Sequence, residues 1–279
     1  MIVVVGDLVA DIVVLGASAL EHATDNPARV ALTRGGSAAN VAAAAARQHP
    51  VRFIGRVGDD TIGRTLVAEL EAVGVEARVQ CGGRTGAIVV LVDDAGERTM
   101  ITDRGAAADL DRIDPSWIHG ADWLHLPLYG FASERSRTAI TDAAAAVSRR
   151  GAPVSLDLSS VATLRELGGE QLSAVVGRIR PSVVFANADE AQVARDLGLD
   201  PAGADFVVKR GADPVRVTSQ GRTAEVPVTR VTDVVDSTGA GDAFAAGYIV
   251  SALRGGDPWA SAAAGSRHAA AALRVAGAL

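Results

Sequence analysis

Residues 236–245 read DSTGAGDAFA, a run of small residues with an internal acid. We predict a strand at residues 231–235 and a helix from Ala243 onward, so the run is a strand-to-helix turn. Gly239 and Gly241 permit backbone angles that a side chain disfavours, and they leave amide groups uncovered at the start of the helix. Unpaired amides and the helix dipole favour negative charge, so the turn is predicted to hold an anion, most naturally a phosphate.

Asp242 indicates what the turn does chemically. Its carboxylate would repel a phosphate held by the amides of residues 240–242, which is unfavourable for binding alone. The acid is useful if it accepts the proton of a hydroxyl that attacks phosphorus, a contribution of roughly 10²–10⁴-fold in rate, while the amides stabilise the transferred group. The turn is not a dinucleotide fingerprint, because Phe244 replaces the third glycine, and no GxxxxGK[ST] loop occurs. The alternative is a glycine-rich turn whose acid only offsets the helix dipole.

The bulk composition is that of a chain able to bury a large core. It has 279 residues, 48% of them hydrophobic, which fits one large α/β domain with a small appendage. A net charge of −6 without clustered basic residues predicts no nucleic-acid partner. Nearly all basic residues are arginine, and Lys209 is the only lysine.

The composition also bears on location. Cys81 is the only cysteine, which excludes an internal disulfide and indicates a reducing compartment. The N-terminal MIVVVGDL leads straight into a strand pattern without signal-peptide features, and no run of about eighteen uncharged apolar residues of spanning type occurs. We therefore expect a cytoplasmic protein with no membrane partner.

Short β-branched runs alternate with Ala-rich helical stretches along most of the chain. Strands are predicted at residues 2–5, 12–15, 51–54, 87–92, 123–126, 154–158, 183–185 and 206–209. Helices are predicted at residues 37–48, 61–73, 134–149, 189–197, 240–253 and 258–275. This alternation predicts an α/β fold with a parallel sheet covered by helices on both faces.

Two segments, residues 12–34 and 78–104, break the alternation, because they hold strand-like pieces with no helix between them. Residues 85–102, TGAIVVLVDDAGERTMIT, are typical of a hairpin with its turn at residues 94–96. We therefore expect residues 1–279 to form a single α/β domain, with the two segments extending outward as a small β-sheet lid.

Three further motifs accompany the turn. Residues 236–249 (DSTGAGDAFAAGYI) resemble the C-terminal signature of the ribokinase-like (PfkB) carbohydrate kinases. Residues 35–48 (GGSAANVAAAAARQ) and 55–75 (GRVGDDTIGRTLVAELEAVGV) are similar to the N-terminal signature, and residues 187–190 (NADE) to a shorter motif. The order and spacing agree over essentially the whole chain. The resemblance implies a ribokinase-like three-layer α/β/α domain with a mainly parallel central sheet and a small β-sheet lid.

The resemblance also implies roles for residues at matching positions. Asp242 matches the catalytic base, and the anion hole is matched by Gly239, Ala240 and Gly241 together with the amide of Asp242. Substrate-contacting positions are matched by Asp11, Gly35, Gly36, Asn40 and Arg104. ATP-binding positions are matched by Asn187, Lys209, Gly211 and His268. Glu190 matches a position that reaches Mg²⁺ through water, and Asp236 and Thr238 match positions near a monovalent-cation site.

Several of these residues have simpler interpretations when the resemblance is left aside. Residues 187–190 are typical of a helix N-cap with acids in the first turn, and Ser37 is a candidate N-cap. Arg104 could be solvated, and His268 could be packed under a loop. His119 and His125 are expected to pack rather than bind metal. The chain stops at RVAGAL, before the loop that completes the nucleotide and cation site in ribokinases, so potassium activation is not expected.

Together these features predict a cytoplasmic kinase that transfers the γ-phosphoryl group of ATP, with Mg²⁺, to a hydroxymethyl oxygen of a small carbohydrate such as a ribose, fructose or keto-deoxy-sugar. The alternatives are a nucleoside kinase of the same family and a non-catalytic sugar or nucleotide sensor. Aromatic residues make up only 4% of the chain, which favours the sugar. A phosphorylated sugar would need cationic partners, for which Arg104 and Arg98 are candidates. A homodimer through the lid is expected if one face of the lid is apolar.

Overall fold

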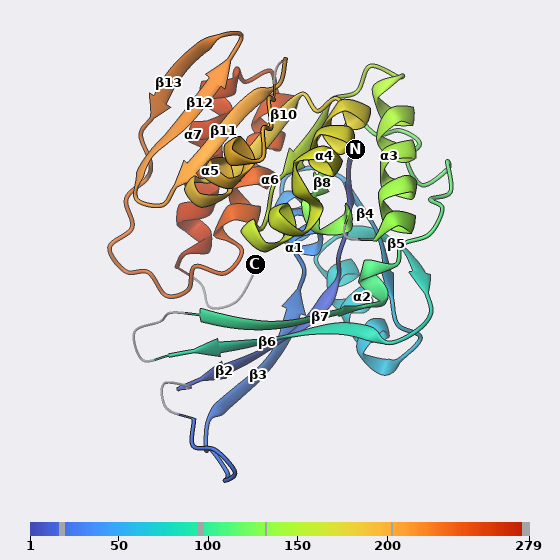
Figure 1. The fold of residues 1–279 in the computed structure, drawn as a ribbon, viewed down its shortest axis with the longest axis vertical. Helices are drawn as coiled ribbons and strands as arrows, with labels where there is room; N and C mark the ends of the chain where they lie inside the picture. Colours follow the sequence, from blue (N-terminus) through green and yellow to red (C-terminus); the bar gives the residue numbers. More distant parts are fainter. Residues whose placement is uncertain (17–19, 94–97, 132, 202, 275–279) are drawn as a thin grey trace.

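The computed structural model describes the chain except for residues 17–19, 94–97, 132, 202 and 275–279. A nine-stranded sheet forms its centre, in the order β13-β12-β11-β10-β9-β8-β1-β4-β5 (Figure 1). Its strands are β1 (Ile2–Val5), β4 (Val51–Val57), β5 (Val75–Cys81), β8 (Trp123–Pro127), β9 (Val154–Asp157), β10 (Val183–Asn187), β11 (Asp205–Arg210), β12 (Asp213–Ser219) and β13 (Arg222–Val226). All pairings from β5 to β11 are parallel, and β12 and β13 add an antiparallel edge.

Helices cover both faces of this sheet. One face packs against α1 (Ser37–Ala46), α2 (Thr61–Ala72), α6 (Ala240–Leu253) and α7 (Pro258–Ala272). The other packs against α3 (Glu134–Ser148), α4 (Val161–Ile179) and α5 (Ala188–Asp196). Successive β1 residues enter opposite cores, Ile2 and Val4 on the first side and Val3 and Val5 on the second, because strand side chains alternate. The predicted three-layer α/β/α arrangement is confirmed. No described helix is long and apolar enough to cross a membrane.

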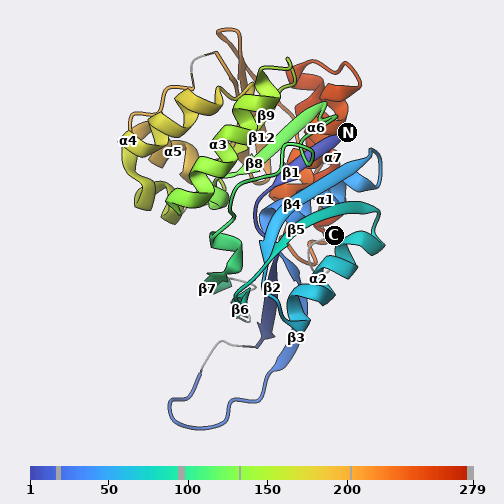
Figure 2. The same cartoon turned by 90° about the vertical axis from the view of Figure 1, so that its right-hand side faces the viewer.

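A second, four-stranded sheet projects away from the large one (Figure 2). Its order is β3 (Arg29–Gly35), β2 (Val9–Leu15), β6 (Thr85–Val92) and β7 (Arg98–Gly105). Only β2 and β6 run parallel, and β6 and β7 pair as the predicted antiparallel hairpin, whose expected turn at residues 94–96 lies outside the described residues. This small sheet contains most of the two segments predicted to form the lid. Residues 78–81 belong instead to β5 in the large sheet.

Asp60 ties the small sheet to the large domain. It is the N-cap of α2, where its Oδ1 accepts a hydrogen bond from the amide of Gly63 at 2.8 Å. The same carboxylate accepts from the hydroxyl of Thr85 at 2.6 Å and from its amide at 2.7 Å, at the first residue of β6. These three hydrogen bonds lower the pKa of Asp60 to about 2, so the link is ionised at physiological pH.

Five elements of the sequence prediction need correction or completion. Residues 231–235 do not form a strand, and Val234 and Val235 are exposed. The helix α4 was not predicted, because Gly168 breaks its pattern with a φ of 68° inside the helical stretch. The strands β5, β12 and β13 were also missed, the last two being joined by a tight turn at Gln220 and Gly221, where both φ angles are positive.

Candidate active site

A cavity of about 1180 Å³ lies where the carboxyl ends of the parallel strands meet the small sheet and the start of α6. This is the edge at which open α/β sheets bind ligands. Single small-molecule pockets usually measure roughly 300–1000 Å³, so the cavity has room for two ligands side by side. The predicted site residues that line it are Asp11, Gly36, Asn40, Arg104, Asn187, Glu190, Lys209, Gly211, Asp236, Thr238, Gly239, Ala240, Gly241 and Asp242.

The floor of the cavity contains the start of α6. Gly239 is the N-cap, with φ 72° and ψ 2° in the left-handed region that glycine adopts without strain. The amide of Ala243 donates to the carbonyl of Gly239 at 2.8 Å, which begins the helical hydrogen bonding. The amides of Gly241 and Asp242 therefore fall in the first turn, where no helical carbonyl can reach them, and both residues line the cavity. The turn can hold an anion.

Two side chains from α1 hold the Asp242 carboxylate. The hydroxyl of Ser37 donates to Oδ1 at 2.7 Å, and Nδ2 of Asn40 donates to Oδ2 at 3.1 Å. Burial raises the pKa of Asp242 to about 7, against the lowering effect of these two hydrogen bonds. The carboxyl group is thus held in one orientation beside an anion-binding turn, with a pKa suited to accepting a proton near neutral pH.

Gly36 and Asp7 explain how α1 begins. Gly36 is the N-cap with φ 101°, and a Cβ atom there would lie 2.5 Å from the carbonyl oxygen of Asp7. Oδ1 of Asp7 accepts from the amide of Ala38 at 3.2 Å. The expectation that Ser37 caps this helix is therefore wrong. Its hydroxyl is used by Asp242 instead.

Asp7, Asp11 and Arg104 line the part of the cavity near the small sheet. Asp11 is only 8% exposed, its Oδ1 has no hydrogen-bond partner among the described residues, and burial followed by the charge of Asp7 raises its pKa to about 6. Arg104 lies 3.5 Å from Oδ2 of Asp7 and stacks on the ring of Tyr129, 4.0 Å from its centroid. Gly35 does not line the cavity, but a Cβ atom there would overlap the Asp11 carboxylate. An oriented set of acceptors and donors of this kind suits a polyhydroxyl ligand.

A buried ion pair lies at the other end of the cavity. Nζ of Lys209 is 2.8 Å from Oδ2 of Asp157, and the two side chains are 17% and 6% exposed. Burial disfavours the ammonium, but the carboxylates of Asp157 and Glu190 outweigh that effect and raise the pKa of Lys209. Asp157 was not predicted as a site residue. It is the last residue of the four-residue strand β9 and belongs to no motif, so only its position at a strand end could have indicated it.

Asn187 and Glu190 form a capping box at the start of α5. The Asn187 side chain accepts from the amide of Glu190 at 2.8 Å, and the Glu190 carboxylate accepts from the amide and side chain of Asn187 at 2.7 and 2.8 Å. Burial, followed by the charge of Asp157, raises the pKa of Glu190 to about 7. The N-cap interpretation of residues 187–190 is therefore correct. Because both residues also line the cavity, the lone pairs of their side-chain oxygens that the capping box does not use remain available to a ligand.

The donor set at this end fits Mg²⁺ that arrives with a nucleotide. Glu190 and Asn187 offer the oxygen ligands that Mg²⁺ prefers, and the cavity leaves space for the waters that it keeps. Among the described residues, no group of three or more His, Cys, Asp or Glu side chains could hold a metal ion by itself. When bound, the ion would neutralise phosphate oxygens.

The remaining predicted residues lie further from these groups. His268 does not line the cavity, and its ring pairs with Nε2 of Gln48 at 2.9 Å and packs against Gly247. The Asp236 carboxylate accepts from the amide and hydroxyl of Thr238, both at 2.8 Å, within its own turn. His125 is fully buried and pairs with Ser155 at 2.8 Å, so it packs in the core as expected, whereas His119 is exposed and the expectation that it packs is wrong.

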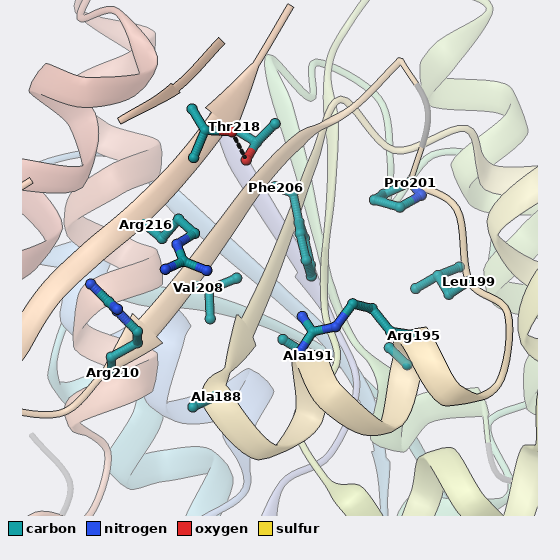
Figure 3. A pocket seen from close by; sticks show the side chains of 12 residues that line it. Ala188, Ala191, Arg195, Leu199, Pro201, Phe206, Val208, Arg210, Arg216 and Thr218 are labelled. Atoms are coloured by element: carbon teal, nitrogen blue, oxygen red, sulfur yellow. Dashed lines mark hydrogen bonds between the residues drawn. The ribbon is translucent and has the colours of Figure 1, made fainter. Parts of the chain in front are cut away.

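A second cavity of about 480 Å³ lies on the α5 side of the large sheet (Figure 3). Phe206 and Val208 line it, with the guanidinium groups of Arg195, Arg210 and Arg216. These cations have partners within the protein: Arg210 and Arg216 pair with Glu225, and Arg195 donates to Gln192. Of these residues only Arg210 also lines the larger cavity.

A turn that can hold an anion, beside an oriented carboxylate at the carboxyl edge of a doubly wound sheet, is suited to phosphoryl transfer. The chain matches the pfkB family carbohydrate kinase over residues 1–279 and belongs to that family. It is 37% identical over 238 residues to an ATP-dependent ribose-1-phosphate kinase of Halopiger xanaduensis, which covers 80% of this chain and 74% of that protein. It is 30% identical over 268 residues to a fructokinase of Escherichia coli, covering 86% and 83%.

The fold comparison agrees with the sequence comparison. The crystal structure of an adenosine kinase from Sinorhizobium meliloti matches with a TM-score of 0.86 at 21% identity, covering 99% of this chain and 94% of that one. The predicted ribokinase-like fold is thereby confirmed. The protein is an enzyme, a sugar or nucleoside kinase, and the alternative of a non-catalytic sensor is set aside.

Proposed function

We propose that the enzyme transfers the γ-phosphoryl group of ATP to a hydroxymethyl oxygen of a small carbohydrate, with Asp242 as the general base. The observation that carries this proposal is the carboxylate of Asp242, fixed by Ser37 and Asn40 beside the bare amides of Gly241 and Asp242. Its pKa of about 7 lets it be ionised at neutral pH and still accept a proton.

The carbohydrate is proposed to lie between Asp242 and the small sheet. Asp7, Asp11, Asn40 and Arg104 would orient its hydroxyl groups there, because they supply acceptors and donors from several directions. ATP would occupy the other end, with its phosphates over the α6 turn and its nucleoside near Gly211 and α7. The small sheet would act as a lid that keeps water from the γ-phosphoryl group.

A nucleoside acceptor is the second candidate. Val13, Ile88 and Val90 line the small-sheet side of the cavity, and a base could pack on this aliphatic surface. Among the described residues that line that side, Tyr129 is the only aromatic one, and Arg104 already covers its ring. The polar set around Asp11 therefore favours the sugar. A phosphorylated sugar is a further possible acceptor. Of the two arginines predicted to bind its phosphate, Arg104 lines the cavity, and the side chain of Arg98 lies outside the described structure.

The deciding experiment is a screen of acceptors with MgATP and an assay of ADP release. We expect one class among ribose, fructose, 2-keto-3-deoxygluconate, ribose 1-phosphate and adenosine to raise ADP release far above the rate without acceptor. A preference for adenosine would show that the enzyme is a nucleoside kinase and not a sugar kinase. If no carbohydrate or nucleoside stimulates ADP release, the proposed reaction is wrong.

We also propose that the enzyme is a cytoplasmic homodimer joined through its small sheets. Arg29, Ala31 and Thr33 of β3 line the cavity, so the alternating residues Val30 and Leu32 face away from it. They are 62% and 61% exposed, and Ile101 of β7 is 61% exposed. An exposed aliphatic sheet face favours association with a second copy.

A further inference from the structure

We propose that Lys209 is a catalytic residue whose ammonium contacts the transferred phosphoryl group, and that Asp157 is a positioning residue that holds the ammonium in place. This inference rests on the proposed function, because it assigns groups to the phosphoryl-transfer step itself.

The geometry places the ammonium next to the anion turn. Lys209 and Asp157 stand at the carboxyl ends of β11 and β9, and their ion pair spans the intervening strand β10. A Cβ atom on Gly241 would lie 3.4 Å from Nζ of Lys209. The ammonium therefore borders the turn whose amides would hold the phosphoryl group, and a glycine there leaves it uncovered. A phosphate oxygen bound at those amides would be within reach of the ammonium.

The energetics of the pair also indicate function rather than stability. Lys209 and Asp157 are largely removed from solvent, and such a pair often contributes nothing to stability over apolar residues, because desolvation offsets the attraction. Lys209 faces further carboxylates at Glu190 and Asp242, so its charge is held in an acid-rich end of the cavity. One of its three N–H groups donates to Asp157, and two remain for phosphoryl oxygens.

The choice of lysine supports the same role. The chain has 27 lysine and arginine residues, and Lys209 is the only lysine among them. Arginine therefore serves at all the other positions. An ammonium is a compact charge on a flexible stem, whereas a guanidinium is a rigid planar fork. A compact charge can stay with a phosphoryl group that moves from donor to acceptor.

The phosphoryl transfer forms one bond to phosphorus and breaks another. The acceptor hydroxyl oxygen forms the new bond to the γ-phosphorus while its proton passes to Asp242. The bond between the γ-phosphorus and its bridging oxygen breaks, and that electron pair leaves with ADP. Lys209 stays protonated throughout and offsets charge on the equatorial oxygens of the transferred group. Asp157 keeps its negative charge and only orients the ammonium.

The first test measures nucleotide binding without any acceptor. For Lys209→Met, calorimetric titration with Mg·β,γ-methylene-ATP should show an affinity loss of about tenfold or more, while ADP affinity changes less than about twofold. Arg216→Met, which removes one cation on the opposite face, should leave both affinities unchanged. Equal losses for both nucleotides, or none, would overturn the contact with the γ-phosphoryl group.

The second test uses turnover and its pH dependence, with the acceptors of the screen assayed in parallel. Lys209→Met should lower kcat by roughly 10²-fold. Lys209→Arg should have a kcat between that of Lys209→Met and that of the wild type. The groups that face Asp242 are Ser37 and Asn40 on α1, Tyr129, Asp157 on β9 and Lys209 on β11.

Because Lys209 lowers the pKa of Asp242 and Asp157 raises it, their variants should move the acid limb of kcat/KM in opposite directions. Lys209→Met should shift it to higher pH and Asp157→Asn to lower pH. Each variant leaves a buried charge without its partner, so the profiles are measured at a temperature at which the melting curve shows each variant folded. Shifts in the same direction would overturn the assignment of Asp157. Full activity of Lys209→Met with an inactive Asp242→Asn would refute this inference alone, whereas full activity of Asp242→Asn would refute the proposed function.

Discussion

Asp242 is surrounded by groups that move its pKa in opposite directions. Burial is the strongest influence and raises the pKa, and the hydrogen bonds from Ser37 and Asn40 lower it. The result, about 7, lies far above the usual value for an aspartate. Because the folded-state pKa is raised, the folded enzyme binds a proton here more tightly than the unfolded chain. Stability from this group is therefore lost as pH rises through about 7, and the carboxyl group proposed as the general base becomes ionised over the same range.

Removal of one hydrogen bond to this carboxylate should be visible in the pH profile. Ser37→Ala deletes the donor 2.7 Å from Oδ1, so the pKa of Asp242 should rise by up to about one unit and shift the acid limb of kcat/KM upward. The measurement is the pH dependence of kcat/KM for the acceptor. Ser148→Ala, at the end of α3, is the matched control. An unmoved or lowered acid limb would show that Ser37 does not act on the base.

At this scale the sequence identified residues that belong to motifs and missed those that do not. The glycines and acid of the α6 turn were predicted with their neighbours in the cavity. Asp157 was missed because a single acid at the end of a short strand has no pattern, although the lone lysine at position 209 indicated that the surroundings of Lys209 were unusual. Ser37 was assigned to the wrong partner, since Gly36 and Asp7 begin the helix in its place.

Among the elements, the start of α1 is the most tightly constrained by sterics. Gly36 has φ 101°, and a Cβ atom would lie 2.5 Å from the carbonyl oxygen of Asp7. We expect Gly36→Ala to destabilise the fold by about 1–3 kcal/mol and to lower kcat, because Ser37 and Asn40 would move with the helix. Thermal unfolding and turnover check this. Gly177→Ala, where a Cβ atom would meet open space within α4, should not destabilise. Unchanged melting of Gly36→Ala would contradict the steric argument.

Two of the failed element predictions have identifiable physical causes. Gly168 interrupts α4 with a non-helical angle, so the apolar spacing on its two sides does not add up to one helix. Residues 231–235 are rich in β-branched side chains but have no neighbouring strand, and the amide of Val235 instead donates to the carbonyl of Leu273 after α7. In the second case tertiary context overrode local propensity.

At the scale of the whole molecule, the small sheet has two apolar faces with different uses. One contributes Val13, Ile88 and Val90 to the cavity, and the other exposes Val30, Leu32 and Ile101. The small sheet could be predicted from the sequence. Which of its faces lines the cavity could not be predicted, because that depends on how the two sheets are arranged in space.

A charge on the outer face should therefore abolish the proposed dimer. We expect Leu32→Lys to elute as a monomer in size-exclusion chromatography with light scattering, where the wild type elutes as a dimer. Val73→Lys, at the exposed end of α2, should remain dimeric. A monomeric wild type, or a dimer that survives Leu32→Lys, would refute association through this face.

The central claim concerns one carboxylate and the alcohol it activates. Its most direct test is the pH dependence of kcat/KM for the acceptor, measured for the wild type and for Asp242→Asn. The account predicts a wild-type acid limb with a midpoint near 7, and for the variant a loss of roughly 10²–10⁴-fold with no such limb. A variant that keeps activity within about tenfold of the wild type, or that retains the same acid limb, would contradict the account.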